Sequence, residues 1–215
     1  MFRREIAQRL KPGRNQRLSL LHLGCGGGHL DWSLKKHFTI NGVDLSQAML
    51  DQARQLNPEV EYLPGDMRSL RLERLFDAVI IADSIDYMLD TGELKAAFAT
   101  AYAHLKPGGV FVTYAEDTRE RFIQNASHCF SEKSGPVEIT VFQNSYDPDP
   151  ADTTIEKTFV YLVRQEGRLS IYNDRHVCGL FSQAAWVECL ETAGFSVQAG
   201  ENIYGDPLFI GIKPG

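Results

Sequence analysis

The chain has 215 residues, 43% of them hydrophobic, which suits one α/β domain that buries its own core. Its formal net charge of −6 argues against a nucleic-acid partner, which would need a basic surface. No apolar run approaches the ~18 residues of a membrane span, so we expect no membrane partner. The cysteines form neither a C-x-x-C pair nor a metal-binding spacing, so we expect reduced thiols, no metal and a cytoplasmic protein.

Strand and helix patterns alternate along the first half of the chain. An amphipathic helix is predicted over Phe2–Leu10. The predicted strands are Leu18–Leu23, Ile40–Val43, Glu61–Leu63, Phe76–Ala82 and Val110–Tyr114. Between them, helices are predicted over Leu30–His37, from an N-cap at Ser46 through Gln55, and over Gly92–His104. This alternation predicts a mostly parallel sheet covered by helices.

The pattern changes after Tyr114. Residues 137–143, 156–163 and Leu169–His176 alternate with the period of two that is typical of antiparallel strands. We therefore expect residues 120–178 to form a β insertion that lies as a lid over the sheet's carboxyl edge, within a single domain of residues 1–215. No element is predicted around His128 and Cys129. A helix over Ser182–Ala193 and an antiparallel strand pair, Phe195–Ala199 with Leu208–Ile212, complete the chain.

A glycine-rich segment follows the first predicted strand: Leu-His-Leu-Gly-Cys-Gly-Gly-Gly at 21–28. Glycines at alternate positions let the backbone turn sharply and let a ligand approach it closely. The third glycine of a dinucleotide G-x-G-x-x-G motif would stand at position 29, which is His29. The spacing therefore points to an adenosine ligand without phosphates, and the alternative is a tight turn with no ligand.

Two acidic residues end the next two predicted strands. Asp44 lies 20 positions after Gly24, where a carboxylate can accept both hydroxyl protons of a ribose. The alternative role is a loop or N-cap aspartate. Asp66 can accept a hydrogen bond from an adenine amino group while Met67 packs on the ring, or Gly65-Asp66 is only a turn.

Together these segments resemble the class I S-adenosylmethionine-dependent methyltransferases. The matching segments are 21–28, Gly-Val-Asp-Leu-Ser (42–46), Gly-Asp-Met (65–67), Phe-Asp-Ala-Val-Ile (76–80) and Leu-Lys-Pro-Gly-Gly (105–109). The resemblance implies an α/β fold, a doubly wound Rossmann-like sheet of seven strands in the order 3-2-1-4-5-7-6, with strand 7 antiparallel. It also implies S-adenosylmethionine as cofactor, bound by Gly24, Cys25, Gly26, Gly28, Asp44, Leu45, Asp66, Met67 and Ala82.

One position departs from the family pattern. His22 stands where the family commonly carries an acid that supports the glycine turn and the methionine amino group. Loss of that acid is expected to weaken cofactor binding, although an imidazole can still hydrogen-bond the turn.

The later segments 146–150 and 174–181 look like small-molecule methyltransferases with antiparallel strands over the active site, among them sugar N-methyltransferases of antibiotic pathways. We therefore expect methyl transfer to nitrogen or oxygen of a small molecule. The alternatives are a non-catalytic S-adenosylmethionine-binding or scaffolding protein, and an NAD-dependent oxidoreductase.

His176 and Asp83 are the candidate catalytic bases. The plainer roles are a solvated or backbone-paired histidine and a helix cap involving Ser84.

Phe2–Lys11 supplies at most one helix before the first strand, whereas family members often carry a longer helical lid. Three explanations are open: the insertion closes the site, a second subunit covers it, or activity is impaired. We favour closure by the insertion, in a monomer or a homodimer.

Overall fold

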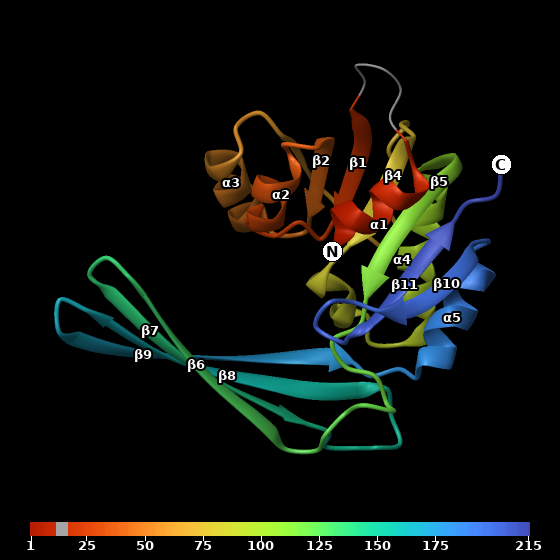
Figure 1. The fold of residues 1–215 in the computed structure, drawn as a ribbon. Helices are drawn as coiled ribbons and strands as arrows, with labels where there is room; N and C mark the ends of the chain where they lie inside the picture. Colours follow the sequence, from red (N-terminus) through yellow and green to blue (C-terminus); the bar gives the residue numbers. More distant parts are fainter. Residues whose placement is uncertain (12–16) are drawn as a thin grey trace.

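The computed structural model describes residues 1–11 and 17–215, which form two sheets and their flanking helices (Figure 1). The larger sheet has the order β3-β2-β1-β4-β5-β11-β10, and β11 runs antiparallel to both of its neighbours. This confirms the predicted strand order. Its strands are β1 (Leu18–Leu23), β2 (Phe38–Asp44), β3 (Glu61–Pro64), β4 (Phe76–Ile81), β5 (Leu105–Tyr114), β10 (Ser196–Glu201) and β11 (Pro207–Ile212).

Helices cover both faces of this sheet. They are α1 (Phe2–Arg9), α2 (His29–Leu34), α3 (Gln47–Leu56), the 3-10 helix η1 (Asp83–Tyr87), α4 (Thr91–Ala103) and α5 (Gln183–Thr192). One buried cluster packs α4 and α5 on the sheet through Phe98, Phe111 and Trp186. A second packs α1, α2 and α3 on the opposite face through Ile6, Leu34, Leu50 and their neighbours. Within the described residues, no helix is both long and apolar enough to cross a membrane.

Most predicted boundaries lie within a few residues of the observed ones. Ser46 is the N-cap of α3, as predicted, and its hydroxyl accepts a hydrogen bond from the backbone of Met49 at 3.4 Å. The second helix ends at Leu34, three residues before its predicted end at His37. The next element, β2, begins at Phe38, two residues before its predicted start at Ile40, because Phe38 already pairs with Leu18 of β1.

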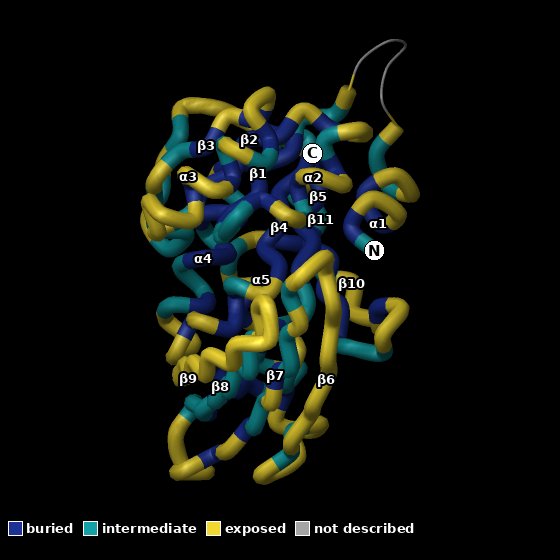
Figure 2. Tube along the Cα trace, turned by 90° about the vertical axis from the view of Figure 1, so that its left-hand side faces the viewer, coloured by how far each residue is buried: buried dark blue, intermediate teal, exposed yellow. Residues whose placement is uncertain are grey.

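The insertion is a four-stranded antiparallel sheet in the order β6-β7-β8-β9. Its strands are β6 (Ala126–Ser134), β7 (Val137–Tyr146), β8 (Thr154–Gln165) and β9 (Arg168–Gly179). The sheet projects from the end of the larger sheet at which β4 and β5 finish (Figure 1). Strand β6 was not predicted, because almost all of its residues are exposed and no buried face imposes an alternation (Figure 2).

Lys157 of β8 joins the insertion to the larger sheet. Its ammonium lies 2.8 Å from Glu116 Oε2 and 2.9 Å from Asp117 Oδ2, just beyond β5. It also lies 3.4 Å from Asp86 Oδ2 in η1. Burial alone would lower the pKa of Lys157, but the attraction of these carboxylates outweighs it and raises that pKa. Burial raises the pKa of Asp86, and the positive charge of Lys157 offsets only part of that rise.

Replacing this buried cation is expected to destabilise the fold. Lys157→Met should lower the free energy of unfolding by about 3 kcal/mol, the lower end for removing one partner of a buried pair, because Glu116 and Asp117 stay partly hydrated. Urea unfolding measures the change. Lys133→Met is the matched control, since Lys133 pairs with Glu138 on the exposed tip of the same insertion. Equal stability of the two variants would contradict the prediction.

Candidate active site

The glycine turn between β1 and α2 has a backbone that only glycine adopts easily. Gly24, Gly26 and Gly28 have φ values of 69°, 51° and 76°. A Cβ on Gly24 would collide with Ser84, and one on Gly28 would lie 2.7 Å from Asn57 Nδ2. A Cβ on Gly26 would meet nothing within 4 Å. Protein atoms therefore crowd two of the glycines, whereas the backbone at Gly26 faces open space that a ligand can enter.

A buried chain of side-chain hydrogen bonds supports this turn. His22 Nδ1 lies 2.7 Å from Asp31 Oδ1, and the Tyr62 hydroxyl donates to Asp31 Oδ2 at 3.0 Å. The Asn57 amide donates to the Tyr62 oxygen and to the carbonyl of Gly28, both at 2.9 Å. His22 therefore reaches the turn through three other side chains. Asp31 places an acid on α2, beside the strand position where the family commonly carries one.

Asp44 links the glycine turn to the start of α3. Its Oδ2 accepts a hydrogen bond from the Gly26 N–H at 2.7 Å, and its Oδ1 accepts one from the Ser46 N–H at 2.9 Å. Each oxygen keeps a second lone pair for a ligand hydroxyl. The N-cap of α3 is Ser46, so the alternative role of Asp44 as that cap is wrong. Asp44 is half-buried, and both of its carboxylate oxygens accept backbone hydrogen bonds at the turn.

Asp66 is held by an arginine that sequence analysis did not single out. Arg68 donates to both carboxylate oxygens through Nε at 3.1 Å and to Oδ2 through Nη2 at 2.7 Å. A second contact, with Glu93 of α4, orients the guanidinium. Hydrogen bonding from Arg68 lowers the pKa of Asp66. Asp66 is therefore ionised and fixed in orientation, and part of its accepting capacity is already used.

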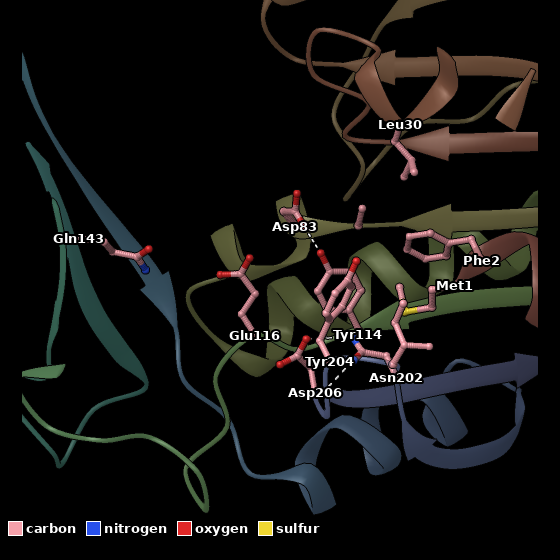
Figure 3. Close-up of a pocket in the computed structure, with 12 residues that line it drawn as sticks. Met1, Phe2, Leu30, Asp83, Tyr114, Glu116, Gln143, Asn202, Tyr204 and Asp206 are labelled. Carbon is pink, nitrogen blue, oxygen red and sulfur yellow. Dashed lines mark hydrogen bonds between the residues drawn. The ribbon is translucent and has the colours of Figure 1, made fainter. Parts of the chain in front are cut away.

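Three adjoining cavities lie along the carboxyl edge of the sheet. The strand-two cavity, of about 260 Å³, is lined by Asp44, Leu45, Ser46, Asp66, Met67, Arg68, Ser84, Tyr87 and Met88. The middle cavity, of about 230 Å³, is lined by Asp83, Asp86, Tyr87, Glu116, Lys157, Phe159, Tyr161, His176 and Cys178. The large cavity, of about 630 Å³, is lined by Met1, Phe2, Leu30, Ala82, Asp83, Tyr114, Glu116, Gln143, Asn202, Ile203, Tyr204 and Asp206 (Figure 3).

Shared residues join these cavities into one path. Tyr87 borders the strand-two and middle cavities, while Asp83 and Glu116 border the middle and large ones. The structure therefore brings the two candidate bases, Asp83 and His176, to the same cavity. Ala82 lines the adjoining large cavity, whereas Asp44 and Asp66 line the strand-two cavity at the other end of the path.

Asp83 opens η1 directly after β4 and receives a hydrogen bond from the hydroxyl of Tyr114 (Figure 3). The carboxyl is exposed at the cavity wall, yet partial desolvation and then the charge of Glu116 raise its pKa. The N-cap of η1 is Ala82 with no side-chain cap bond, so the capping role considered for Asp83 and Ser84 is wrong.

Both ring nitrogens of His176 are engaged within the protein. Nδ1 lies 2.7 Å from the Tyr87 hydroxyl, and Nε2 lies 3.1 Å from Asp174 Oδ2. The Phe159 ring packs edge-on against the imidazole, with 5.3 Å between centroids. His176 therefore contacts the cavity by way of Tyr87 and has no free nitrogen aimed at a substrate.

Cys25 lies within the turn but offers no reactive thiolate. Its side chain is buried, and burial, with the charges of Asp31 and Asp44 after it, raises the pKa of the thiol far above its ordinary value. Cys25 thus contributes packing and backbone to the turn.

Comparison with known proteins identifies the family. The family described as "Methyltransferase domain" matches residues 20–109. A dTDP-3-amino-3,4,6-trideoxy-alpha-D-glucopyranose N,N-dimethyltransferase of Streptomyces venezuelae is 31% identical over 215 residues, covering 97% of this chain and 88% of that protein. The crystal structure of Streptomyces venezuelae DesVI superposes with a TM-score of 0.86 and 31% identity, over 93% of this chain and 85% of that one.

A second solved structure agrees. CalS10, an amino pentose methyltransferase from Micromonospora echinaspora solved with S-adenosylmethionine bound, has a TM-score of 0.85 at 26% identity, over 98% of this chain and 87% of that one. The chain belongs to the class I S-adenosylmethionine-dependent methyltransferases. It is an enzyme with S-adenosylmethionine as cofactor. The two alternatives, a non-catalytic scaffolding protein and an NAD-dependent oxidoreductase, are therefore rejected.

The network under the turn yields a stability prediction. Tyr62→Phe removes the hydroxyl between Asp31 and Asn57, so a buried carboxylate oxygen loses its donor. We expect the free energy of unfolding to fall by about 2 kcal/mol. Denaturant unfolding measures it, with Tyr172→Phe as the control because the Tyr172 side chain is exposed on the insertion. An unchanged stability in Tyr62→Phe would show that these bonds do not support the turn.

Proposed function

We propose that this enzyme transfers the methyl group of S-adenosylmethionine to the amino nitrogen of a small molecule. The observation that carries the proposal is the placement of Asp83 and Glu116 at the ends of β4 and β5, on the wall shared by the middle and large cavities. A protonated amine needs only to lose one proton before it attacks, and a carboxylate can accept that proton. A hydroxyl acceptor benefits from a stronger base, and His176, which lines the middle cavity, has both nitrogens engaged. The names of the relatives support nitrogen as the acceptor.

In this proposal the glycine turn and the strand-two cavity hold the cofactor. Bound S-adenosylmethionine would supply a methyl group on a sulfonium, whose methyl carbon an amine lone pair can attack with the thioether as leaving group. Asp44 accepts the ribose hydroxyls on its free lone pairs, and Asp66 faces the adenine amino group between Leu45 and Met67. The backbone of Gly24, Cys25, Gly26, Gly28 and Ala82 receives the methionine end. The open space over Gly26 supports this placement.

Catalysis rests on positioning, which can supply roughly 7–11 kcal/mol when two reactants are held in line. We propose that Asp83 takes the proton of the acceptor amine. Its raised pKa makes it a better proton acceptor than an ordinary aspartate. His176 then acts as a positioning residue that fixes the Tyr87 hydroxyl between two cavities.

We also propose the setting in which the enzyme works. Residues 120–178 serve as a lid within one domain, held down by Lys157. The four cysteines are free, in keeping with a cytoplasmic enzyme. Its acidic charge favours a small-molecule partner over a nucleic acid, and the expected assembly is a monomer or a homodimer.

The cofactor role of Asp44 can be tested by calorimetry. Asp44→Ala removes two charged acceptors for the ribose, so affinity for S-adenosylhomocysteine should fall by about 100-fold, or about 3 kcal/mol. Asp51→Ala is the matched control, since Asp51 pairs with Arg54 on the exposed face of the adjoining helix. A folded Asp44→Ala protein that keeps its affinity would refute the assignment.

The proton-accepting role of Asp83 can be tested by the pH dependence of kcat for an amine acceptor. Because the pKa of Asp83 is raised, the carboxyl protonates as pH falls toward that value and then cannot accept a proton. Asp83→Asn should lower kcat at neutral pH by about 100-fold and flatten the acidic limb. Glu132→Gln, on exposed β6, should change neither. A normal profile in Asp83→Asn would remove Asp83 from the mechanism.

A further inference from the structure

The Tyr87 side chain lies where two of the cavities meet. It lines the strand-two cavity, which we propose holds the cofactor, and also the middle cavity, which together with the large cavity forms the proposed acceptor space. Its hydroxyl bonds His176, itself a residue of the middle cavity, so the hydroxyl lies at that cavity. A methyl group that passes from cofactor to acceptor crosses between these two cavities. Tyr87 is therefore close to the point of transfer.

The surroundings of His176 determine which way the Tyr87 hydroxyl hydrogen points. His176 Nε2 lies 3.1 Å from Asp174 Oδ2, and a carboxylate has no hydrogen to donate, so the neutral imidazole carries its hydrogen on Nε2. Nδ1 then has a lone pair and no hydrogen. The Tyr87 hydroxyl, whose oxygen is 2.7 Å from Nδ1, must donate to it. The Tyr87 oxygen thus keeps lone pairs for the cavity but has no hydrogen to offer it.

The groups around this pair preserve the arrangement. Burial raises the pKa of Tyr87 above that of an ordinary phenol, so the hydroxyl keeps its proton. The imidazole packs edge-on against Phe159, with 5.3 Å between ring centroids, which limits its rotation. Lys157 pairs with His176 in the register of β8 and β9, yet three carboxylates occupy its ammonium. The hydrogen bond between Tyr87 and His176 therefore has a fixed direction.

An attacking amine needs hydrogen-bond acceptors around it and no donor at its lone pair. After one proton has left, a primary amine presents two N–H groups and one lone pair. In a site shielded from water each N–H needs an acceptor, because an unsatisfied donor is costly. A hydroxyl that is free to rotate can instead donate to the lone pair and hold it away from the methyl carbon. A hydroxyl oxygen that only accepts, as in Tyr87, meets both requirements.

We propose that the Tyr87 oxygen accepts one N–H of the acceptor amine, and that His176 is the positioning residue that keeps the Tyr87 hydrogen away from the amine lone pair. This inference rests on the proposed amine methylation. The protonated amine passes one proton to Asp83. Its lone pair then forms the new N–C bond as the S–C bond breaks, which leaves a neutral thioether and a methylated ammonium. Tyr87 is unchanged by the step.

Two replacements of His176 separate its hydrogen bond from its packing. His176→Asn keeps an acceptor, because the amide oxygen can take the place of Nδ1, but it loses the ring. His176→Phe keeps a ring against Phe159 and loses the acceptor. With dTDP-3-amino-3,6-dideoxyglucose as the test acceptor, we expect kcat to fall about tenfold in His176→Phe, at nearly unchanged KM, and less than about threefold in His176→Asn.

The order of these two variants decides between the two roles. A residue that serves only packing would tolerate phenylalanine better than asparagine. A kcat in His176→Asn as low as that in His176→Phe, or lower, would therefore overturn the inference. Thermal unfolding of both variants shows whether a loss of kcat comes from a loss of folded protein.

Tyr87→Phe removes the proposed acceptor of the amine N–H. With S-adenosylhomocysteine present, calorimetry should show about tenfold weaker binding of the amino sugar nucleotide. Its analogue with hydrogen in place of the amine, dTDP-3,6-dideoxyglucose, should bind the variant and the wild type equally. Tyr172→Phe is the matched control, since Tyr172 is exposed on β9 and lines none of the three cavities. Equal losses for both nucleotides, or no loss for either, would remove Tyr87 from amine recognition.

NMR of protein labelled with nitrogen-15 in its histidines tests the direction of the bond without any acceptor. At about pH 8, above the ordinary histidine pKa, Nε2 of His176 should carry the hydrogen and Nδ1 should not. The signals that vanish in His176→Asn identify this ring. A hydrogen on Nδ1 contradicts the inference whether or not any amine is methylated. The expected tautomer in an enzyme that does not methylate the test amine supports this hydrogen-bond direction and counts against the proposed function.

Discussion

The site depends on the buried hydrogen bonds that hold the glycine turn. They join four elements: β1 through His22, α2 through Asp31, β3 through Tyr62, and the end of α3 through Asn57. In a low-dielectric interior each bond is stronger than in water, and each unpaired group is costly. Because the chain of bonds ends on the Gly28 carbonyl, the left-handed turn is fixed before any ligand arrives. Asp44 links the same turn to α3, because its carboxylate accepts hydrogen bonds from the N–H groups of Gly26 and Ser46.

A second constraint acts at the other end of the path. The insertion is anchored at the end of the larger sheet, where Lys157 contacts η1 and the residues after β5. A buried ion pair contributes little net stability compared with apolar packing, yet it fixes the positions of its members. Here those members also line the cavities, since Glu116 borders the middle and large cavities and Asp86 borders the middle one. The attachment of the insertion and the charge of the proposed acceptor space thus come from the same groups.

The sequence could predict those parts of the molecule that follow local or periodic rules. The buried strands, the helix cap at Ser46 and the glycine turn all follow from residue type and spacing. Asp44 was found because it ends a strand at a known distance from the turn. Contacts between residues distant in sequence left no such signal, so the pairing of His22 with Asp31 and of Lys157 with Asp86 was not foreseen.

Two other misses have their own causes. Arg68 directly follows Gly-Asp-Met, so an arginine two residues after an acid was a visible signal that was not used. Strand β6 has exposed side chains along nearly its whole length, and the clue to it was Gly135, which turns the chain into β7 with a φ of 57°. Exposure removes the alternation on which strand prediction depends.

The two halves of the site differ in what determines them. The family match ends at residue 109, after the glycine turn, Asp44 and Asp66, so it covers the half of the site that we propose holds the cofactor. Glu116, Lys157, His176 and Asp206 all come later in the chain and form much of the wall of the acceptor space. Relatives can therefore share a methyl donor and a fold while differing in acceptor, because a few charged side chains on the insertion and the β10–β11 loop set the potential that an incoming molecule meets.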